Sequence, residues 1–283
     1  ANNGLKLADL TGVAYDDPKW EQLLDELTVN DLFSLTADGG YHTVGVESIG
    51  LSATEDCDGP TGVHSNYNPA AGPSYPGSVM LACTWNQPLA KARGEQIAKE
   101  CAEINCAGWY APAMNIHRTA FGGRNFEYYS EDPVVSGVMA AACTLGVQET
   151  PGVGACLKHL AANNQESNRN AVDTIVSERT LREIYLKGFE IAVKESKPMS
   201  IMTSYNQING VPAADSYDMN TNIARGEWGF DGMVMTDWGA GNRAGVDTMM
   251  HAGNDLVMPG RTQDRMIAAL QGNPVGTTAN PNL

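Results

Sequence analysis

Positive charge is scarce in this chain. Its 283 residues include 18 lysines and arginines against 33 aspartates and glutamates, which gives a formal net charge of −15. Nucleic acids and anionic membrane surfaces are bound through clustered lysine and arginine, so the composition excludes both as partners. No apolar stretch approaches the ~20 residues of a membrane span. A neutral ligand such as a sugar is indifferent to the sign of the charge.

Motifs for metals and dinucleotides are also missing. The five histidines are scattered, without a His-Glu-x-x-His run or a Cys/His cluster, so the sequence predicts no metal site. No Gly-x-Gly-x-x-Gly follows a strand-like segment, which leaves a dinucleotide-binding fold without local support. We therefore expect no cofactor.

The cysteines form no Cys-x-x-Cys pair, and several stand inside apolar runs. Free buried thiols are favoured over a disulfide framework, and free thiols mildly favour a reducing, cytoplasmic compartment. The sequence shows no signal peptide and begins Ala-Asn-Asn-Gly without methionine, so we expect a processed chain or a piece of a longer one. The cysteines are Cys57, Cys83, Cys101, Cys106, Cys143 and Cys156.

What the sequence does contain is an alternation of strand-like and helical segments. Such alternation predicts βαβ units around a parallel sheet. Their number favours a closed barrel over an open doubly wound sheet, and a barrel of this type takes about 250 residues. With about seven strands, we predict a (β/α)8-type TIM barrel that is irregular or lacks an element. Strands are expected within 50–62, 109–114, 153–157, 199–204, 233–236 and 255–258, and a short apolar run covers 77–83. Helices are expected over 18–36, 86–104, 132–147, 177–194, 219–228, 242–252 and 262–270.

The same pattern predicts the domain organisation. Residues 1–17 form an N-terminal extension, 18–271 the catalytic barrel, and 272–283 an irregular tail rich in glycine, proline and asparagine. Within the barrel, Thr180 and Glu183 have the spacing of a capping box for the helix over 177–194.

Asp237 stands at the end of the buried-strand run Met-Val-Met-Thr and is followed by Trp238 and a glycine. A carboxylate there is costly unless it has a partner or a function. In a parallel α/β barrel, the carboxyl ends of the strands open into the active site. Position alone leaves two interpretations of Asp237 equally open: a cap of the next helix, or a functional carboxylate.

Polar residues follow the other predicted strands as well, at the same end. Carboxylates, amides, lysine, arginine, histidine, tyrosine and tryptophan can grip hydroxyl groups and offer an aromatic wall. This mixture suits a sugar better than a phosphate, which prefers glycine-rich loops at a helix N-terminus. The residues are Asp58, Asn115, His117, Lys158, His159, Tyr205 and Asn206, with Arg124, Glu127, Glu166 and Arg169 between strands.

Six segments in this order carry a resemblance to a known family. They are Asp58-Gly-Pro-Thr-Gly-Val63, Gly123-Arg-Asn-Phe-Glu127 with Ser130-Glu-Asp-Pro133, Lys158-His159 with Asn164-Gln-Glu166, Ser177-Glu-Arg-Thr-Leu-Arg-Glu183, Ser204-Tyr-Asn206 with Asn209-Gly-Val-Pro212, and Gly229-Phe-Asp-Gly232 with Thr236-Asp-Trp238. Across roughly residues 50–260, the chain resembles the catalytic barrel of glycoside hydrolase family 3, in its β-glucosidase and β-xylosidase branch.

The resemblance implies a retaining glycosidase that acts on β-linked glucosides or oligosaccharides, with Asp237 as the nucleophile. Nearby cations are expected to keep Asp237 ionised, and Tyr205 to hydrogen-bond its carboxylate. Trp238 would form an apolar wall. The implied residues of the subsite for the non-reducing sugar are Asp58, Arg124, Lys158, His159, Arg169 and Tyr205.

A retaining glycosidase also needs an acid, and the resemblance implies that it lies outside the barrel. In this family it usually comes from a companion α/β sandwich domain, and we expect that domain before or after this chain. Within the chain, Glu127 and Glu166 are the candidates, although both resemble structural positions of the family motifs.

Alternative interpretations remain open. Lys158 at a strand end also fits a Schiff-base lyase or aldolase. A barrel fragment that binds sugar without turning it over is the non-enzymatic alternative. Individual residues have structural alternatives too: an Arg124–Glu127 ion pair, a surface Arg169, a core His159 and a core Met202.

Overall fold

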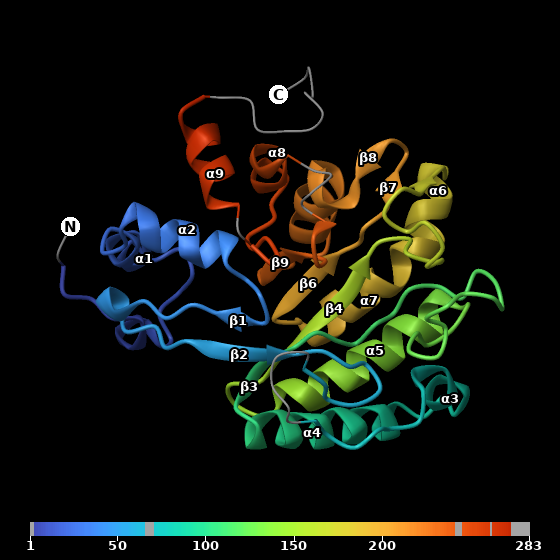
Figure 1. Ribbon diagram of the computed structural model, residues 1–283. Helices are drawn as coiled ribbons and strands as arrows, with labels where there is room; N and C mark the ends of the chain where they lie inside the picture. Colours follow the sequence, from blue (N-terminus) through green and yellow to red (C-terminus); the bar gives the residue numbers. More distant parts are fainter. Residues whose placement is uncertain (1–2, 66–70, 241–244, 261, 273–283) are drawn as a thin grey trace.

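The computed structural model describes residues 3–65, 71–240, 245–260 and 262–272 (Figure 1). The start of the helix predicted over 242–252 and nearly all of the predicted tail lie outside these residues. The prediction of domain boundaries at 17 and 271 stays a prediction.

A six-stranded sheet forms the centre of the molecule. From β2 to β9 all neighbours pair in parallel, whereas β1 pairs antiparallel with β2. The order along the sheet is β1 (His42–Thr43), β2 (Thr54–Cys57), β3 (Cys106–Trp109), β4 (Gly154–Leu160), β6 (Ser200–Thr203) and β9 (Met233–Thr236).

The segment after β9 returns to the beginning of the sheet. Leu256 forms a parallel bridge with Met235 of β9. The next residue, Val257, donates its N–H to the Thr36 carbonyl at 2.8 Å, and the Leu256 side chain packs against Gly39, just before β1. The fold is therefore a TIM-barrel-like α/β structure, as predicted, and its irregularity is the antiparallel first strand.

Helices cover the outside of the sheet (Figure 1). α4 (Gln87–Glu103), α5 (Pro133–Gln148) and α7 (Lys187–Ser196) pack side by side against β3, β4 and β6. Both long helices begin at side-chain caps: Asn86 accepts from Leu89 N, and Asp132 accepts from Val134 N and Val135 N. The largest core cluster joins α5 and α7 to β4 and β6, through Leu157, Phe189 and Ile201 among others.

Two predicted helices are divided differently in the structure. The helix expected over 18–36 is α1 (Lys19–Leu24) followed by α2 (Val29–Ala37), because Thr28 and Asp31 form a capping box that starts a second helix. The capping box predicted at Thr180 is wrong. The cap is Ser177, whose hydroxyl accepts from Thr180 N, and the helix runs through α6 (Glu178–Thr180) and the π-helix η3 (Leu181–Tyr185) into α7.

The strand expected over 109–114 pairs earlier, as β3, and beyond it only Ala113 forms an isolated bridge, with Lys158. The remaining elements are short. They are η1 (Leu7–Leu10), η2 (Glu47–Ile49), α3 (Ser78–Cys83), β5 (Asp173–Thr174), β7 (Gln207–Ile208), β8 (Val211–Pro212), η4 (Ala213–Asp215), the π-helix η5 (Asp218–Glu227), α8 (Val246–His251) and α9 (Gln263–Leu270).

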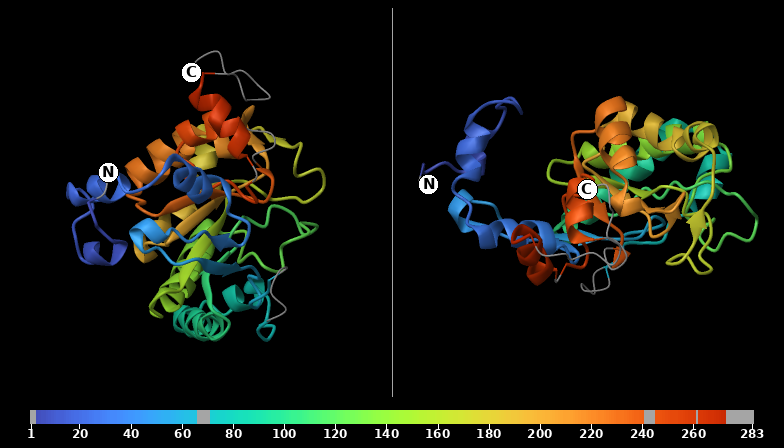
Figure 2. Two further views of the ribbon diagram at one scale, coloured as in Figure 1. Left: turned by 60° about the vertical axis from the view of Figure 1, so that its left-hand side comes forward. Right: turned by 90° about the horizontal axis from the view of Figure 1, so that it is seen from above.

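The N-terminal segment has a small core of its own. Leu10 of η1 packs with Leu23 of α1 and with Val46 and Ile49, which follow the first strand. Figure 2 shows this blue segment beside the barrel, with its first helices extending away from it.

All six cysteines are free, which confirms the thiol prediction, although Cys83 is exposed. Among the described residues, no helix has both the length and the apolar character to cross a membrane.

Candidate active site

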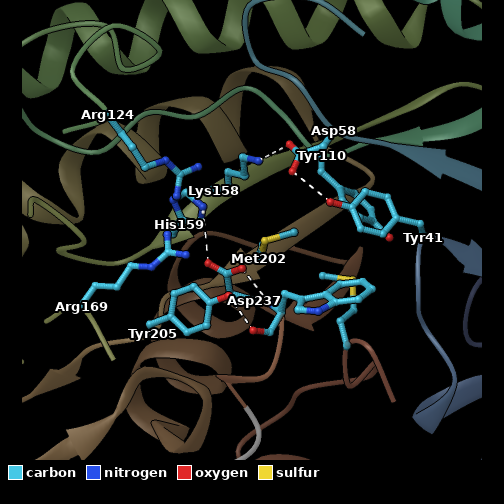
Figure 3. A pocket seen from close by; sticks show the side chains of 12 residues that line it. Tyr41, Asp58, Tyr110, Arg124, Lys158, His159, Arg169, Met202, Tyr205 and Asp237 are labelled. Atoms are coloured by element: carbon cyan, nitrogen blue, oxygen red, sulfur yellow. Dashed lines mark hydrogen bonds and ion pairs between the residues drawn. The ribbon is translucent and has the colours of Figure 1, made fainter. Parts of the chain in front are cut away.

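A pocket of about 400 Å³ opens at the carboxyl ends of the barrel strands (Figure 3). The structure brings all eight residues predicted for the site together in its wall. The lining residues are Tyr41, Asp58, Tyr110, Arg124, Lys158, His159, Arg169, Met202, Tyr205, Asp237, Trp238 and Met258.

Lys158 and Asp58 form an ion pair on one side of the pocket. Lys158 lies in the buried strand β4, and its Nζ is 2.5 Å from Oδ1 of Asp58, directly after β2. The Gly59 N–H donates to the same oxygen at 2.8 Å, and the Tyr41 hydroxyl donates to Oδ2 at 3.3 Å. Burial opposes the ionisation of Asp58, but the charge and hydrogen bond of Lys158 outweigh it, so the pKa of Asp58 is lowered. The Asp58 carboxylate is therefore ionised, and the two side chains of this ion pair can hydrogen-bond sugar hydroxyls.

Asp237, at the end of β9, is buried, and its two carboxylate oxygens differ in their hydrogen bonding. Its Oδ1 accepts from the Trp238 N–H at 2.6 Å. Its Oδ2 has no hydrogen-bond partner in the described part of the chain, and the imidazole Nε2 of His159 lies 3.6 Å from it. Burial raises the pKa of Asp237, although the Trp238 N–H and the charge of Lys158 act to lower it. Lys158, Arg124 and Arg169 act in the direction expected of nearby cations, and burial is the larger effect on the pKa. That Asp237 is ionised stays a prediction.

Tyr205 and Arg169 close the side next to Asp237. The Tyr205 hydroxyl donates to the Trp238 carbonyl at 2.5 Å. Burial, and then the charge of Asp237 and a hydrogen bond to its carboxylate, raise the pKa of Tyr205, so the expected contact between Tyr205 and Asp237 is also present. The Arg169 guanidinium lies 4.5 Å from the centre of the Tyr205 ring, and its Nη1 is 2.7 Å from Oε2 of Glu166. Arg169 is thus a lining residue held by two contacts.

Arg124 has both of the roles that the sequence left open. Its Nε is 2.5 Å from Oε1 of Glu127, and the same side chain lines the pocket. Glu127 and Glu166 each hold an arginine, and neither of these two candidate acids lines the pocket.

His159 is buried and surrounded by polar partners. Its peptide N–H donates to Asn115 Oδ1 at 2.8 Å, and its carbonyl accepts from Asn115 Nδ2 at 2.8 Å. Its Nδ1 lies 3.2 Å from the hydroxyl of Tyr128. Burial, and then the charges of Arg124 and Lys158, push the pKa of His159 well below its usual value. The imidazole is therefore neutral.

Three lining residues escaped the sequence analysis: Tyr41, Tyr110 and Met258. Tyr110 directly follows β3, so the strand-end rule that selected Lys158 could have found it. Tyr41 precedes a two-residue strand and Met258 follows no regular strand, so their place depends on tertiary packing. The Tyr41 ring centre lies 5.1 Å from that of Trp238, which makes the apolar wall a pair of rings.

The residues that line the pocket bear on two further predictions. Met202 belongs to the buried cluster inside the barrel, as predicted, and also lines the pocket. His117 does not reach it. Among the described residues, no group of His, Cys, Asp or Glu is arranged to hold a metal ion.

A polar pocket at the mouth of a barrel, with paired charges, aromatic rings and a carboxylate with a free oxygen, defines a carbohydrate-active barrel domain. The profile of the family described as "Glycosyl hydrolase family 3 N terminal domain" matches residues 46–274, and the chain belongs to this family.

Relatives agree with the assignment. The chain is 42% identical over 258 residues to an exo-α-(1→6)-L-arabinopyranosidase of Bifidobacterium longum, covering 87% of this chain and 34% of the relative. It is 41% identical over 245 residues to thermostable β-glucosidase B of Acetivibrio thermocellus, covering 82% and 32%.

A solved structure shows the same similarity in three dimensions. β-Glucosidase 3B of Thermotoga neapolitana, in complex with α-D-glucose, superposes with a TM-score of 0.82 at 42% identity, covering 90% of this chain and 40% of that one. The chain spans about a third of the length of the curated relatives that it matches.

Proposed function

We propose that this chain provides the nucleophile-bearing barrel of a retaining exo-β-glycosidase of the β-glucosidase type. The observation that carries the proposal is the free Oδ2 of Asp237 in a pocket of sugar size. A buried carboxylate with one oxygen fixed by a backbone N–H and one unoccupied is suited to attack an anomeric carbon. The names of the relatives support a pyranoside substrate.

The reaction would proceed by double displacement. Asp237 Oδ2 forms a bond to the anomeric carbon while the bond from that carbon to the leaving oxygen breaks, and the leaving oxygen takes a proton from an acid. Water then attacks the anomeric carbon of the glycosyl ester and gives a proton to the group that acted as the acid in the first step. The bond from the anomeric carbon to Asp237 breaks, which releases the sugar and restores the Asp237 carboxylate.

The remaining lining residues would bind the sugar. Asp58 can accept hydrogen bonds from hydroxyls, while Lys158, Arg124 and Arg169 can donate charge-assisted ones. Trp238 with Tyr41 offers an apolar face for the C–H side of the ring. Arg124 and Arg169 keep their orientation through Glu127 and Glu166.

The acid would come from outside this chain. Of the described lining residues only Asp58 and Asp237 are carboxylic acids, and the Lys158 ion pair keeps Asp58 ionised. A companion α/β sandwich domain is our expected source, and the greater length of the relatives leaves room for one.

The second candidate is a barrel that binds sugar but does not turn it over alone. The lack of a free acid among the described lining residues favours it for the isolated chain. A Schiff-base reaction is disfavoured, because Lys158 Nζ is paired with Asp58 at 2.5 Å and an ammonium group is not a nucleophile.

Trapping distinguishes these functions. A 2-deoxy-2-fluoro-β-glucoside with a dinitrophenolate leaving group needs no acid for the first step, so incubation should add one fluoroglycosyl group to the Asp237 peptide by mass spectrometry. Asp237→Asn should remain unlabelled. Borohydride reduction in the presence of an aldehyde substrate would tag Lys158 if the lyase interpretation held. Sugar binding without either label would favour the binding-only barrel.

A further inference from the structure

A chain of buried polar side chains stands behind the imidazole of His159, on the side away from Asp237. Three of its members, Asn163, Tyr128 and His159, are almost fully buried, whereas Glu166 at its outer end is partly buried, and each member contacts the next. In order, the members are Glu166, Asn163, Tyr128 and His159. On the other side, the imidazole points toward Asp237 (Figure 3).

The direction of the first two hydrogen bonds is fixed by chemistry. The Glu166 carboxylate, paired with Arg169, can only accept, so the Asn163 group 3.1 Å from it must be the amide Nδ2. The same Nδ2 lies 3.1 Å from the Tyr128 hydroxyl and donates to it. The Tyr128 oxygen therefore accepts from Asn163, and its own proton needs another acceptor.

His159 Nδ1, at 3.2 Å, is the acceptor that the described residues offer to the Tyr128 proton. An Nδ1 that accepts carries no proton of its own. Because burial and the neighbouring cations keep the ring neutral, its single proton must then be on Nε2.

Asn115 offers the opposite arrangement. Its Oδ1 lies 3.2 Å from Nδ1 and could accept a proton from it. That oxygen, however, already accepts from the His159 peptide N–H at 2.8 Å. With the proton on Nδ1, the buried Tyr128 hydroxyl would lose its acceptor, and the Nε2 lone pair would face Asp237 Oδ2 at 3.6 Å. Both consequences are costly, because a buried donor is left unpaired and two acceptors oppose each other.

We propose that Tyr128 is a positioning residue that holds the ring proton of His159 on Nε2, directed at the free Oδ2 of Asp237. The role in catalysis rests on the proposed function, whereas the tautomer does not. At 3.6 Å from Oδ2, the positive end of the Nε2–H dipole stabilises the ionised form of the nucleophile. Tyr128 itself does not touch the substrate pocket.

The test is Tyr128→Phe, which keeps the ring under Arg124 and removes only the hydroxyl. The matched control is Tyr129→Phe. Tyr129 is equally buried and adjacent in sequence, but it belongs to the core cluster and not to the pocket. Both variants lose one buried hydroxyl, so a general packing effect would appear in both.

The first readout is the tautomer, measured by ¹⁵N NMR of the chain labelled at its five histidine rings. We expect the Nε2–H form of His159 in the wild type and in Tyr129→Phe. In Tyr128→Phe the proton moves to Nδ1, where Asn115 Oδ1 accepts it. An Nδ1–H form in the wild type, or an unchanged tautomer in Tyr128→Phe, overturns the proposal. The tautomer of the wild-type protein tests the proposal by itself, even if Tyr128→Phe does not fold.

The second readout is kcat/KM for a dinitrophenyl β-glucoside against pH, in the full-length protein. In Tyr128→Phe we expect the acidic limb to move to higher pH and the plateau to fall about tenfold, while Tyr129→Phe keeps the wild-type profile. An identical shift in both variants overturns the positioning role. Failure to trap Asp237 would instead reject the proposed function and leave the NMR result standing.

Discussion

Lys158 Nζ lies 2.5 Å from Asp58 Oδ1, although 100 residues separate the two in the chain. The pair joins the ends of β2 and β4 across the mouth of the barrel. Its charges remove two alternative chemistries at once: Asp58 is not a proton donor, and Lys158 is not a free amine. What remains is a pair of hydroxyl-binding groups beside Asp237.

Removing the Lys158 side-chain amine should therefore affect both the Asp58 and the Asp237 carboxylates. Lys158→Met leaves Asp58 without its partner, and we expect kcat/KM for an aryl glucoside to fall by about a hundredfold or more. The acidic limb should also move to higher pH, because Lys158 lowers the pKa of Asp237, already raised by burial. Lys194→Met, an exposed lysine paired with Glu190, is the control. An acidic limb at the wild-type position would contradict the electrostatic role.

The nucleophile assignment predicts a loss of turnover without a loss of folding. Asp237→Asn keeps an acceptor for the Trp238 N–H but cannot form the glycosyl ester. Residual activity above about a thousandth of the wild-type activity would contradict the assignment of Asp237 as the nucleophile. Because burial raises the pKa of Asp237, the variant should be at least as stable as the wild type at neutral pH in thermal unfolding. The exposed Asp231→Asn should match the wild type in both measurements.

Asp56 should make stability depend on pH. Its carboxylate is buried beside Tyr110, whose hydroxyl donates to it at 3.0 Å, and burial raises its pKa to about 6. Between pH 4 and pH 6 the folded state binds more protons at this site than the unfolded state does, so stability falls as the pH rises. The contribution lost approaches about 3 kcal/mol.

The comparison is with Asp56→Asn, in which this pH dependence is absent. The free energy of unfolding of the wild type, measured with urea, should fall relative to that of Asp56→Asn between pH 4 and pH 7. Asp264→Asn, on the exposed side of α9, should keep the wild-type slope. Parallel curves for the wild type and Asp56→Asn would refute the burial argument.

The contact between α4 and α5 depends on two glycines. A Cβ on Gly94 would lie 2.1 Å from the Cys143 carbonyl oxygen, and one on Gly146 would lie 2.1 Å from the Lys91 carbonyl oxygen. Gly94→Ala should lower the free energy of unfolding by about 2 kcal/mol or more, because forced separation of the helices exceeds the gain in helix propensity. Gly226→Ala, at an exposed position in η5 without a close contact, should change it little. Equal stability of both variants in chemical unfolding would contradict close packing.

Local sequence predicted the long elements well and their limits less well. α4 and α5 lie within two residues of their predicted bounds, because a cap and an apolar stripe are local signals. The strand predicted over 109–114 was displaced, because pairing with β2 and β4 decides where β3 forms. The capping box at Thr180 was misplaced because Ser177, three residues earlier, takes the same role.

The sequence by itself determined the alternation that builds the barrel and the polar residues that end its strands. It could do so because hydrophobic periodicity and the cost of burying charge are written in neighbouring residues. Tertiary structure alone decided the antiparallel β1, the place of Tyr41 and Met258 in the pocket wall, and the partners of His159. It also decided the direction in which the pKa of Asp237 shifts, because a pKa depends on burial and on charges that arrive from distant strands.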